Sequence, residues 1–168
     1  MDPQANLTKG LTDEVHPGTY DVFCGDPAHF HQLRDNLSLL HGSNSLTLLE
    51  RNLIGEVDAY IRLQKILSWE QFSYFDYILI DTPPSFGVMT LNALAASDYL
   101  GIVIHPAIYS LQGTNALMET FTKVKDTLNP DLSLLGAFVN AVDERLIITR
   151  EIMAELHDYF GSHLVVPG

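Results

Sequence analysis

The stretch Phe75-Asp76-Tyr77-Ile78-Leu79-Ile80-Asp81-Thr82-Pro83-Pro84-Ser85 puts four apolar residues in a row, directly before an aspartate and a pair of prolines. A short apolar run bounded by turn-forming residues is typical of a buried parallel strand. The prolines fix φ and remove backbone donors, so the chain beyond Asp81 must form a stiff turn. We therefore expect residues 77–80 to be a strand, with Asp81 at its carboxyl end.

Similar apolar runs recur along the chain with helix-length intervals between them. They lie at residues 100–104, 134–139 and 164–166, and a weaker run at 46–49 is a candidate for a fifth strand. Residues 90–96, 117–128 and 152–160 have helical composition or spacing, and Gly161 stands where a helix end tolerates φ > 0. This order predicts one α/β domain over residues 1–168, built on a three-layer, open, mostly parallel sheet. Residues 2–41 are expected to form loops and short helices.

Composition limits the functions that the chain can serve. Apolar residues make up 46% and charged residues 18% of the 168, a globular balance. Nine Lys and Arg against 21 acidic residues give a net charge of −12, which disfavours a strongly DNA-coating protein. A single cysteine and the lack of a signal-like start indicate a cytoplasmic protein. The apolar runs fall short of the roughly 20 residues that span a bilayer, so no membrane partner is expected.

Two aspartates are candidates for chemistry. Asp81 follows a predicted parallel strand, at the sheet edge where α/β proteins bind ligands, and a carboxylate there can hold Mg²⁺ through water. A helix N-cap is the alternative role for such a residue. Asp2 precedes a proline near the chain start, and its alternative role is a turn-forming Asp-Pro pair.

The two motifs together resemble a known family. Asp81-Thr82-Pro83-Pro84-Ser85 resembles the Walker B and switch II segment of the ParA/Soj-type partition ATPases, and Asp2-Pro3-Gln4-Ala5-Asn6-Leu7-Thr8 resembles their switch I. The resemblance covers nearly all 168 residues and implies a P-loop NTPase fold that uses ATP and Mg²⁺. It implies catalytic roles for Asp2, which would position the attacking water, and for Asp81, which would organise Mg²⁺, with Pro83 at the nucleotide.

The resemblance extends to residues with weaker signals. Asn140 ends an apolar run where related sheets place a base-contacting residue, and satisfied turn chemistry is the alternative role that the residues favour. Arg145 and Arg150 match basic positions that touch DNA phosphates in chromosomal relatives, and solvated surface arginines are the alternative. The implied partners are a second copy in a homodimer, a centromere-binding ParB-like or cargo-adaptor protein, and non-specific DNA.

The sequence contains no G-x-x-x-x-G-K-[ST] loop, which supplies the amides, lysine and hydroxyl that hold a nucleoside triphosphate. We therefore expect this chain alone to bind ATP poorly and to be inactive as an ATPase. We also expect a fragment or a start at an internal methionine, with the P-loop, the first strands and the C-terminal helix of the family missing. Two functions stay open: ATP-dependent positioning of plasmid, chromosome or protein cargo, or a non-enzymatic module that binds a partner.

The seven histidines invite a metal-site hypothesis. His29 and His31 alternate as two ligands on a strand would, but no third Cys or His lies at a recognised spacing. We therefore expect surface histidines without a metal.

Overall fold

A computed structural model describes residues 1–106, 110–140, 142 and 147–166 of the chain. The fold contains two compact units, Met1–Ala96 and Ser97–Gly168, which are described separately. The prediction of a single domain over residues 1–168 stays a prediction. Among the described residues, no helix has the length and apolar character needed to cross a membrane.

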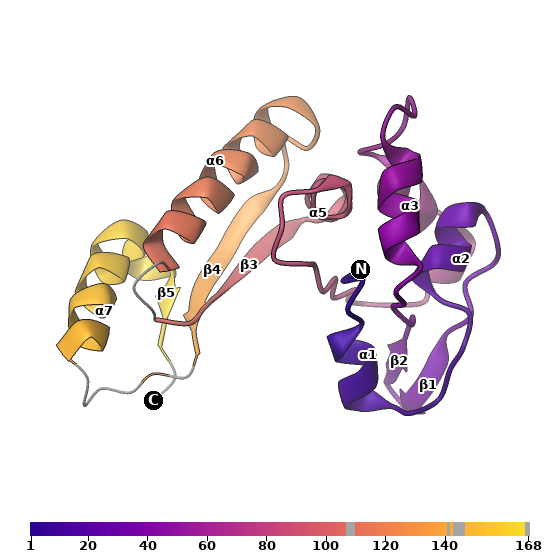
Figure 1. Ribbon diagram of the computed structural model, residues 1–168, viewed down its shortest axis with the longest axis horizontal. Helices are drawn as coiled ribbons and strands as arrows, with labels where there is room; N and C mark the ends of the chain where they lie inside the picture. The colour runs from indigo at the N-terminus through magenta and orange to yellow at the C-terminus, as the bar shows by residue number, and fades with distance from the viewer. Residues whose placement is uncertain (107–109, 141, 143–146, 167–168) are drawn as a thin grey trace. The chain divides into compact units, whose positions relative to one another are not determined.

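The first unit is mainly helical, with one small hairpin (Figure 1). Its elements in chain order are α1 (Asn6–Leu11), α2 (Thr19–Cys24), β1 (His31–Arg34), β2 (Leu37–Leu39), α3 (Leu46–Leu53), α4 (Arg62–Leu67), the 3-10 helix η1 (Glu70–Phe72) and α5 (Val88–Ala96). The strands β1 and β2 pair antiparallel, with His31 opposite Leu39. The short helices were expected, but the hairpin was not.

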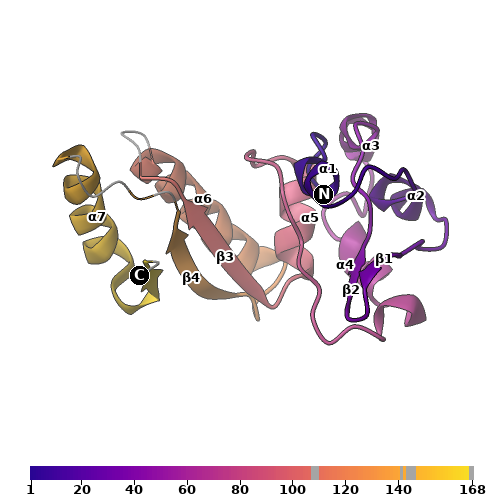
Figure 2. The same ribbon diagram turned by 90° about the horizontal axis from the view of Figure 1, so that it is seen from below.

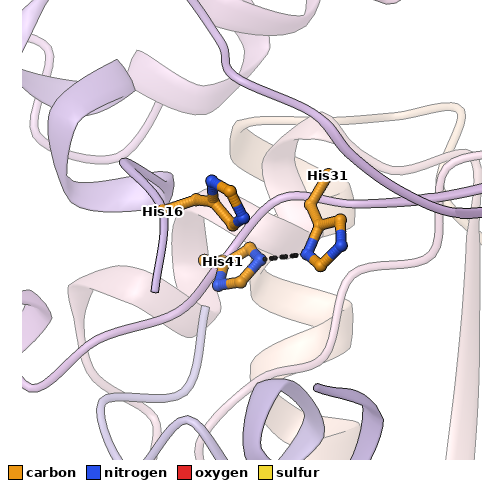
Figure 3. Close-up of side chains that lie close together, drawn as sticks. All are labelled: His16, His31 and His41. Atoms are coloured by element: carbon orange, nitrogen blue, oxygen red, sulfur yellow. Dashed lines mark hydrogen bonds between the residues drawn. The ribbon is translucent and has the colours of Figure 1, made fainter. Parts of the chain in front are cut away.

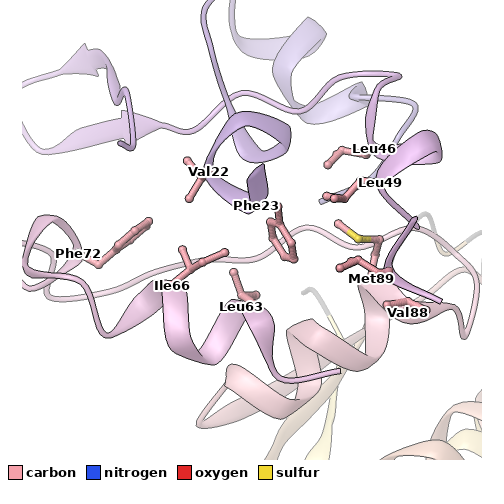
Figure 4. Close-up of a cluster of buried hydrophobic side chains, with 10 residues drawn as sticks. Val22, Phe23, Leu46, Leu49, Leu63, Ile66, Phe72, Val88 and Met89 are labelled. Atoms are coloured by element: carbon pink, nitrogen blue, oxygen red, sulfur yellow. The ribbon is translucent and has the colours of Figure 1, made fainter. Parts of the chain in front are cut away.

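The core of this unit gathers apolar side chains from four helices and the 3-10 turn (Figure 4). Phe23 of α2, Leu49 of α3, Leu63 of α4, Phe72 of η1 and Met89 of α5 are all buried in one cluster. Burying such side chains contributes about 1.5–3 kcal/mol each, so this cluster is the main stabilising feature of the unit.

Two strand predictions in this unit are wrong. Residues 46–49 belong to α3, because Leu46, Leu49 and Leu53 are buried at helical spacing. Residues 77–80 form no strand, since no described strand pairs with them. Their exposure alternates as along an extended chain: Tyr77 and Leu79 are 89% and 93% exposed, whereas Ile80 packs against the core.

The second unit is a run of two βαβ crossovers. Its elements are β3 (Tyr99–Ile104), α6 (Ser110–Thr127), β4 (Ser133–Val139), α7 (Ile147–Phe160), the 3-10 helix η2 (Gly161–His163) and β5 (Leu164–Val165). The strands lie in the order β3-β4-β5 and are all parallel. The α/β class with a parallel sheet is therefore confirmed, as are the helices expected at residues 90–96, 117–128 and 152–160.

Both helices of the second unit pack on this sheet, and α6 runs beside β3 and β4 in both views (Figure 1 and Figure 2). Leu156 of α7 is fully buried against a cluster that includes Ile102 of β3 and Ala137 of β4. Along β3 burial alternates, with Val103 73% exposed between two buried isoleucines. Gly161 takes φ = 53° directly after α7, as expected for a helix end.

Candidate functional site

The first unit contains a cavity of about 400 Å³. Side chains of α1, α4 and the hairpin form its apolar wall, together with residues 77–80. Asp2 and Asp81 also line it, as does Met1. The structure therefore brings together the two aspartates that are 79 positions apart in the sequence.

Asp2 is buried, and its carboxylate is held by the turn that starts α1. One oxygen accepts the Gln4 N–H at 2.9 Å, and the other accepts the Asn6 side-chain amide at 3.4 Å. The Asp2 carbonyl accepts the Ala5 N–H at 3.0 Å, and Ala5 takes the left-handed conformation at φ 53°. These bonds realise the turn-forming role that the Asp-Pro pair suggested.

Asp81 is exposed and directly follows residues 77–80, the irregular segment that forms no strand. Its carbonyl accepts a hydrogen bond of 2.6 Å from the ammonium of Met1. Burial lowers the pKa of this ammonium, and the nearby Asp81 and Asp2 carboxylates oppose that shift. The charges of both aspartates therefore favour the protonated form of the Met1 ammonium. Pro83 follows as a half-buried residue, and the turn ends where Thr90 of α5 donates to the Ser85 carbonyl at 2.6 Å.

The cavity fits magnesium better than it fits a nucleotide. Mg²⁺ prefers carboxylate oxygens with retained waters, so the exposed carboxylate of Asp81 is a suitable ligand, whereas both oxygens of Asp2 already accept hydrogen bonds. A triphosphate needs cations and converging amides. The described residues that line the cavity include no Lys or Arg, and its ionised side chains are carboxylates. This cavity therefore does not suit ATP phosphates.

The remaining predicted site residues belong to the second unit. Asn140 is exposed directly after β4, and its N–H donates to the Ile104 carbonyl at 2.8 Å. Arg150 is an exposed residue of α7. Arg145 lies outside the described residues. A role for Asn140 in nucleotide binding, and for the arginines in DNA binding, stays a prediction.

The expectation of unremarkable surface histidines is wrong for part of the set. His29 is exposed, but His41 is buried, and His31 lies against it together with His16 (Figure 3). No local sequence pattern predicts this cluster, because it depends on the β1-β2 hairpin, which brings residues 31 and 41 together. The pair Asp35-Asn36 between two apolar-containing runs was the available signal for that hairpin.

Comparison with known proteins identifies the family. A family model described as an AAA domain matches residues 1–134. The chromosome-partitioning ATPase Soj of Treponema pallidum is 34% identical over 96% of this chain and 65% of its own length. The chromosome partitioning protein ParA of Myxococcus xanthus is 35% identical over 98% of this chain and 60% of its own length. The chain thus spans somewhat less than two thirds of these relatives.

Solved structures agree on the fold. Cobyrinic acid a,c-diamide synthase from Mycobacterium smegmatis, with a bound ATP analogue and magnesium, superposes with a TM-score of 0.85 at 28% identity, over 95% of this chain and 68% of that one. A plasmid partition protein from Borrelia burgdorferi gives 0.79 at 20% identity, over 99% and 72%. The chain belongs to the AAA domain family, in the ParA/Soj type of partition ATPases.

Proposed function

We propose that this chain serves the ATP-dependent segregation or positioning of plasmid, chromosome or protein cargo, as a ParA/Soj-type partition protein. The observation that supports this is the meeting of Asp2 and Asp81 at one cavity. These are the residues that resemble the family's switch I and Walker B aspartates. The M. smegmatis relative was solved with an ATP analogue and magnesium, which is the chemistry expected of this family.

In this proposal the aspartates have separate roles. Asp81 is the magnesium ligand, because its carboxylate is exposed at the cavity. Asp2 is the group that orients water, once its hydrogen bonds to Gln4 and Asn6 rearrange. Phosphoryl transfer depends on held phosphates. The described residues that line the chain's own cavity include no Lys or Arg, so we assign no phosphoryl-transfer step to this sequence by itself.

A titration with Mg-ATP tests the proposal. We would compare the chain as it stands with a chimaera that carries the P-loop segment of the Treponema relative before Met1. The chain is expected to show no saturable binding below millimolar ATP, and the chimaera to bind and hydrolyse ATP. Tight Mg-ATP binding by the chain alone, or a folded chimaera that binds no nucleotide, contradicts the proposal.

Substitutions in the chimaera assign the roles. Asp81→Asn should weaken the magnesium dependence of binding, and Asp2→Asn should lower turnover while binding persists. Asp76→Asn is the matched control, because Asp76 is exposed on the same segment but does not line the cavity. Equal effects of all three variants would count against specific roles for Asp2 and Asp81.

The proposed partners are a second copy of the chain, a ParB-like or cargo-adaptor protein, and non-specific DNA. The feature that supports DNA binding is Arg150, which is exposed on α7. The net charge of −12 opposes it. In the chimaera, Arg150→Glu should reduce DNA retention at low salt, since phosphate contacts dominate such binding. Lys123→Glu, at an exposed position of α6, is the control of equal charge change. Equal losses would indicate a diffuse charge effect.

The second candidate function is a non-enzymatic module that binds a partner protein. It is favoured by the apolar cavity without Lys or Arg in its described lining and by the 93% exposed Leu79. This candidate predicts that the chain alone is soluble and folded, and that a P-loop segment adds no ATPase activity. The titration above therefore separates the two functions.

A further inference from the structure

Three imidazoles converge in the first unit (Figure 3). One nitrogen from each of His16, His31 and His41 lies within 4.8 Å of the others. The His31 Nδ1 and His41 Nε2 atoms are 3.1 Å apart. The ring centroids lie 4.7 Å apart for His16 and His31, 5.1 Å for His16 and His41, and 5.3 Å for His31 and His41.

Backbone contacts hold the two ends of this cluster in place. The Thr19 N–H donates to the His41 carbonyl at 2.8 Å, and Gly18 forms a parallel bridge with His41. A Cβ on Gly18 would overlap the His41 carbonyl oxygen, so this close approach requires glycine. His16 stands two residues before Gly18. The start of α2 is therefore hydrogen-bonded to the segment just after β2 that contains the buried His41.

The hairpin supplies the third imidazole. His31 begins β1 and is paired with Leu39 of β2, two residues before His41. Its side chain is 16% exposed, and that of His16 is 40% exposed. The cluster thus runs from the buried His41 to a solvent-facing edge, which leaves a path for an ion to enter.

A carboxylate lies at the exposed edge. One Glu14 oxygen is 2.9 Å from His16 Nε2 and 3.6 Å from His31 Nε2. The Glu14 N–H donates to the Thr12 hydroxyl at 3.1 Å, which fixes the local turn.

We propose that His16, His31 and His41 bind one zinc ion, with Glu14 orienting the His16 ring through its hydrogen bond. Three imidazole nitrogens form a donor set that zinc accepts, with water in the fourth tetrahedral position. Mg²⁺ and Ca²⁺ take oxygen ligands, so this site is chemically distinct from a magnesium site at Asp81. The inference is independent of the proposed partition function.

The geometry needs only small side-chain movements. Zn–N bonds of about 2.0–2.1 Å in a tetrahedron put the nitrogens roughly 3.3 Å apart. The His31 and His41 nitrogens are already at 3.1 Å, and the remaining pairs lie within 4.8 Å. Closing the set requires the His16 side chain, which is 40% exposed, to move toward the other two rings.

The site has a direct link to the segment that resembles switch I. Gly42 follows His41, and its N–H donates to the Thr8 hydroxyl of α1 at 3.0 Å. A bound ion would tie together the turn before α2, the hairpin and this contact. We therefore expect zinc to stabilise the first unit.

Calorimetric titration of the untagged chain with ZnCl₂ tests the proposal, with Co²⁺ as a spectroscopic probe. We expect one saturable site per chain, intense visible absorption of tetrahedral Co²⁺, and an unfolding midpoint raised by about 5–10 °C at a hundredfold excess over Kd. No saturable site, or several weak sites, would overturn the proposal.

Variants identify the ligands. His16→Gln and His31→Gln should each weaken zinc binding on the order of 100-fold, and Glu14→Gln about tenfold or more. His29→Gln is the matched control, because His29 is an exposed neighbour outside the cluster, and it should bind zinc like the parent chain. Circular dichroism without metal verifies that each variant is folded. Equal weakening by His29→Gln, or unchanged binding by folded His16→Gln and His31→Gln, contradicts the assignment.

Discussion

The side-chain oxygen of Asn92 accepts the N–H of Leu63 at 3.0 Å, and this bond joins α5 to the first turn of α4. First-turn N–H groups have no partner within their own helix, and α4 has no side-chain cap of its own. Asn92 is fully buried, and its amide also donates to the carbonyls of Ala59 and Val88 at 2.6 and 2.9 Å. One side chain thus bonds three backbone polar groups.

Replacing this asparagine should destabilise the first unit strongly. Asn92→Ala leaves the Leu63 N–H and the Ala59 carbonyl without their partner and opens a small void, at an expected cost of about 2–4 kcal/mol. Urea unfolding followed by the fluorescence of Trp69, the single tryptophan, measures this loss. Gln64→Ala, at an exposed site of α4, should stay within about 0.5 kcal/mol. A loss below about 1 kcal/mol for Asn92→Ala would show that the network contributes little.

Two glycines give opposite predictions for the same substitution. Gly18→Ala forces a Cβ into the His41 carbonyl, so it should cost about 2 kcal/mol or more and weaken zinc binding as well. Gly10→Ala meets nothing within 4 Å and lies inside α1, so it should stabilise by about 0.5–1 kcal/mol. Thermal unfolding of both variants tests the pair. Equal changes in midpoint would contradict the close approach at Gly18.

Asp58 gives a prediction for low pH. It bonds the guanidinium of Arg62 at 2.6 Å and the ammonium of Lys65 at 3.1 Å, and these hydrogen bonds lower its pKa from 3.8 to about 2. A carboxylate whose pKa is lower in the folded state stabilises above its unfolded pKa and loses that effect as pH falls through its folded pKa. Asp58→Asn should therefore cost about 0.5–1 kcal/mol at pH 7.

The cost of Asp58→Asn should shrink between about pH 4 and pH 2. Chemical unfolding of both proteins at steps from pH 7 to pH 2.5 follows the difference. Asp26→Asn, at an exposed acidic residue that forms no salt bridge with the described residues, is the matched control and should show no such convergence. A difference that stays constant down to pH 2.5 would argue against an ion-pair origin.

Neighbouring residues of the irregular segment should respond differently to charge. Leu79→Lys changes a side chain that is 93% exposed, so stability should change by less than about 0.5 kcal/mol while self-association falls. Ile80→Lys places a charge against the core and should cost several kcal/mol. Light scattering and urea unfolding measure the two effects. Similar destabilisation by both variants would contradict the alternation along residues 77–80.

The sequence was most informative where burial follows a simple period. The strands at residues 100–104 and 134–139 and the helix with Leu156 were predictable, because each packs on its neighbour along the chain. The run at residues 77–80 looks the same, but a strand also needs a partner, and no described strand provides one. Residues 46–49 are ambiguous for a related reason, since short apolar runs suit helix and strand equally.

The candidate sites also differ in whether a local sequence motif reveals them. Asp2 and Asp81 were found because each stands in a local motif with turn-forming prolines. The histidine cluster joins three residues from separate turns and strands, and it forms only because Gly18 lets the chain before α2 approach the end of β2. No local pattern encodes such an approach.

The Met1 ammonium beside Asp81 matters for how the protein is prepared. Acetylation of that amine, or a purification tag fused ahead of it, removes the positive charge that faces the two carboxylates. Measurements of magnesium affinity would then report different electrostatics in tagged and untagged material. The placement of the tag is therefore an experimental variable for this protein, and a carboxyl-terminal tag keeps the amine as the structure shows it.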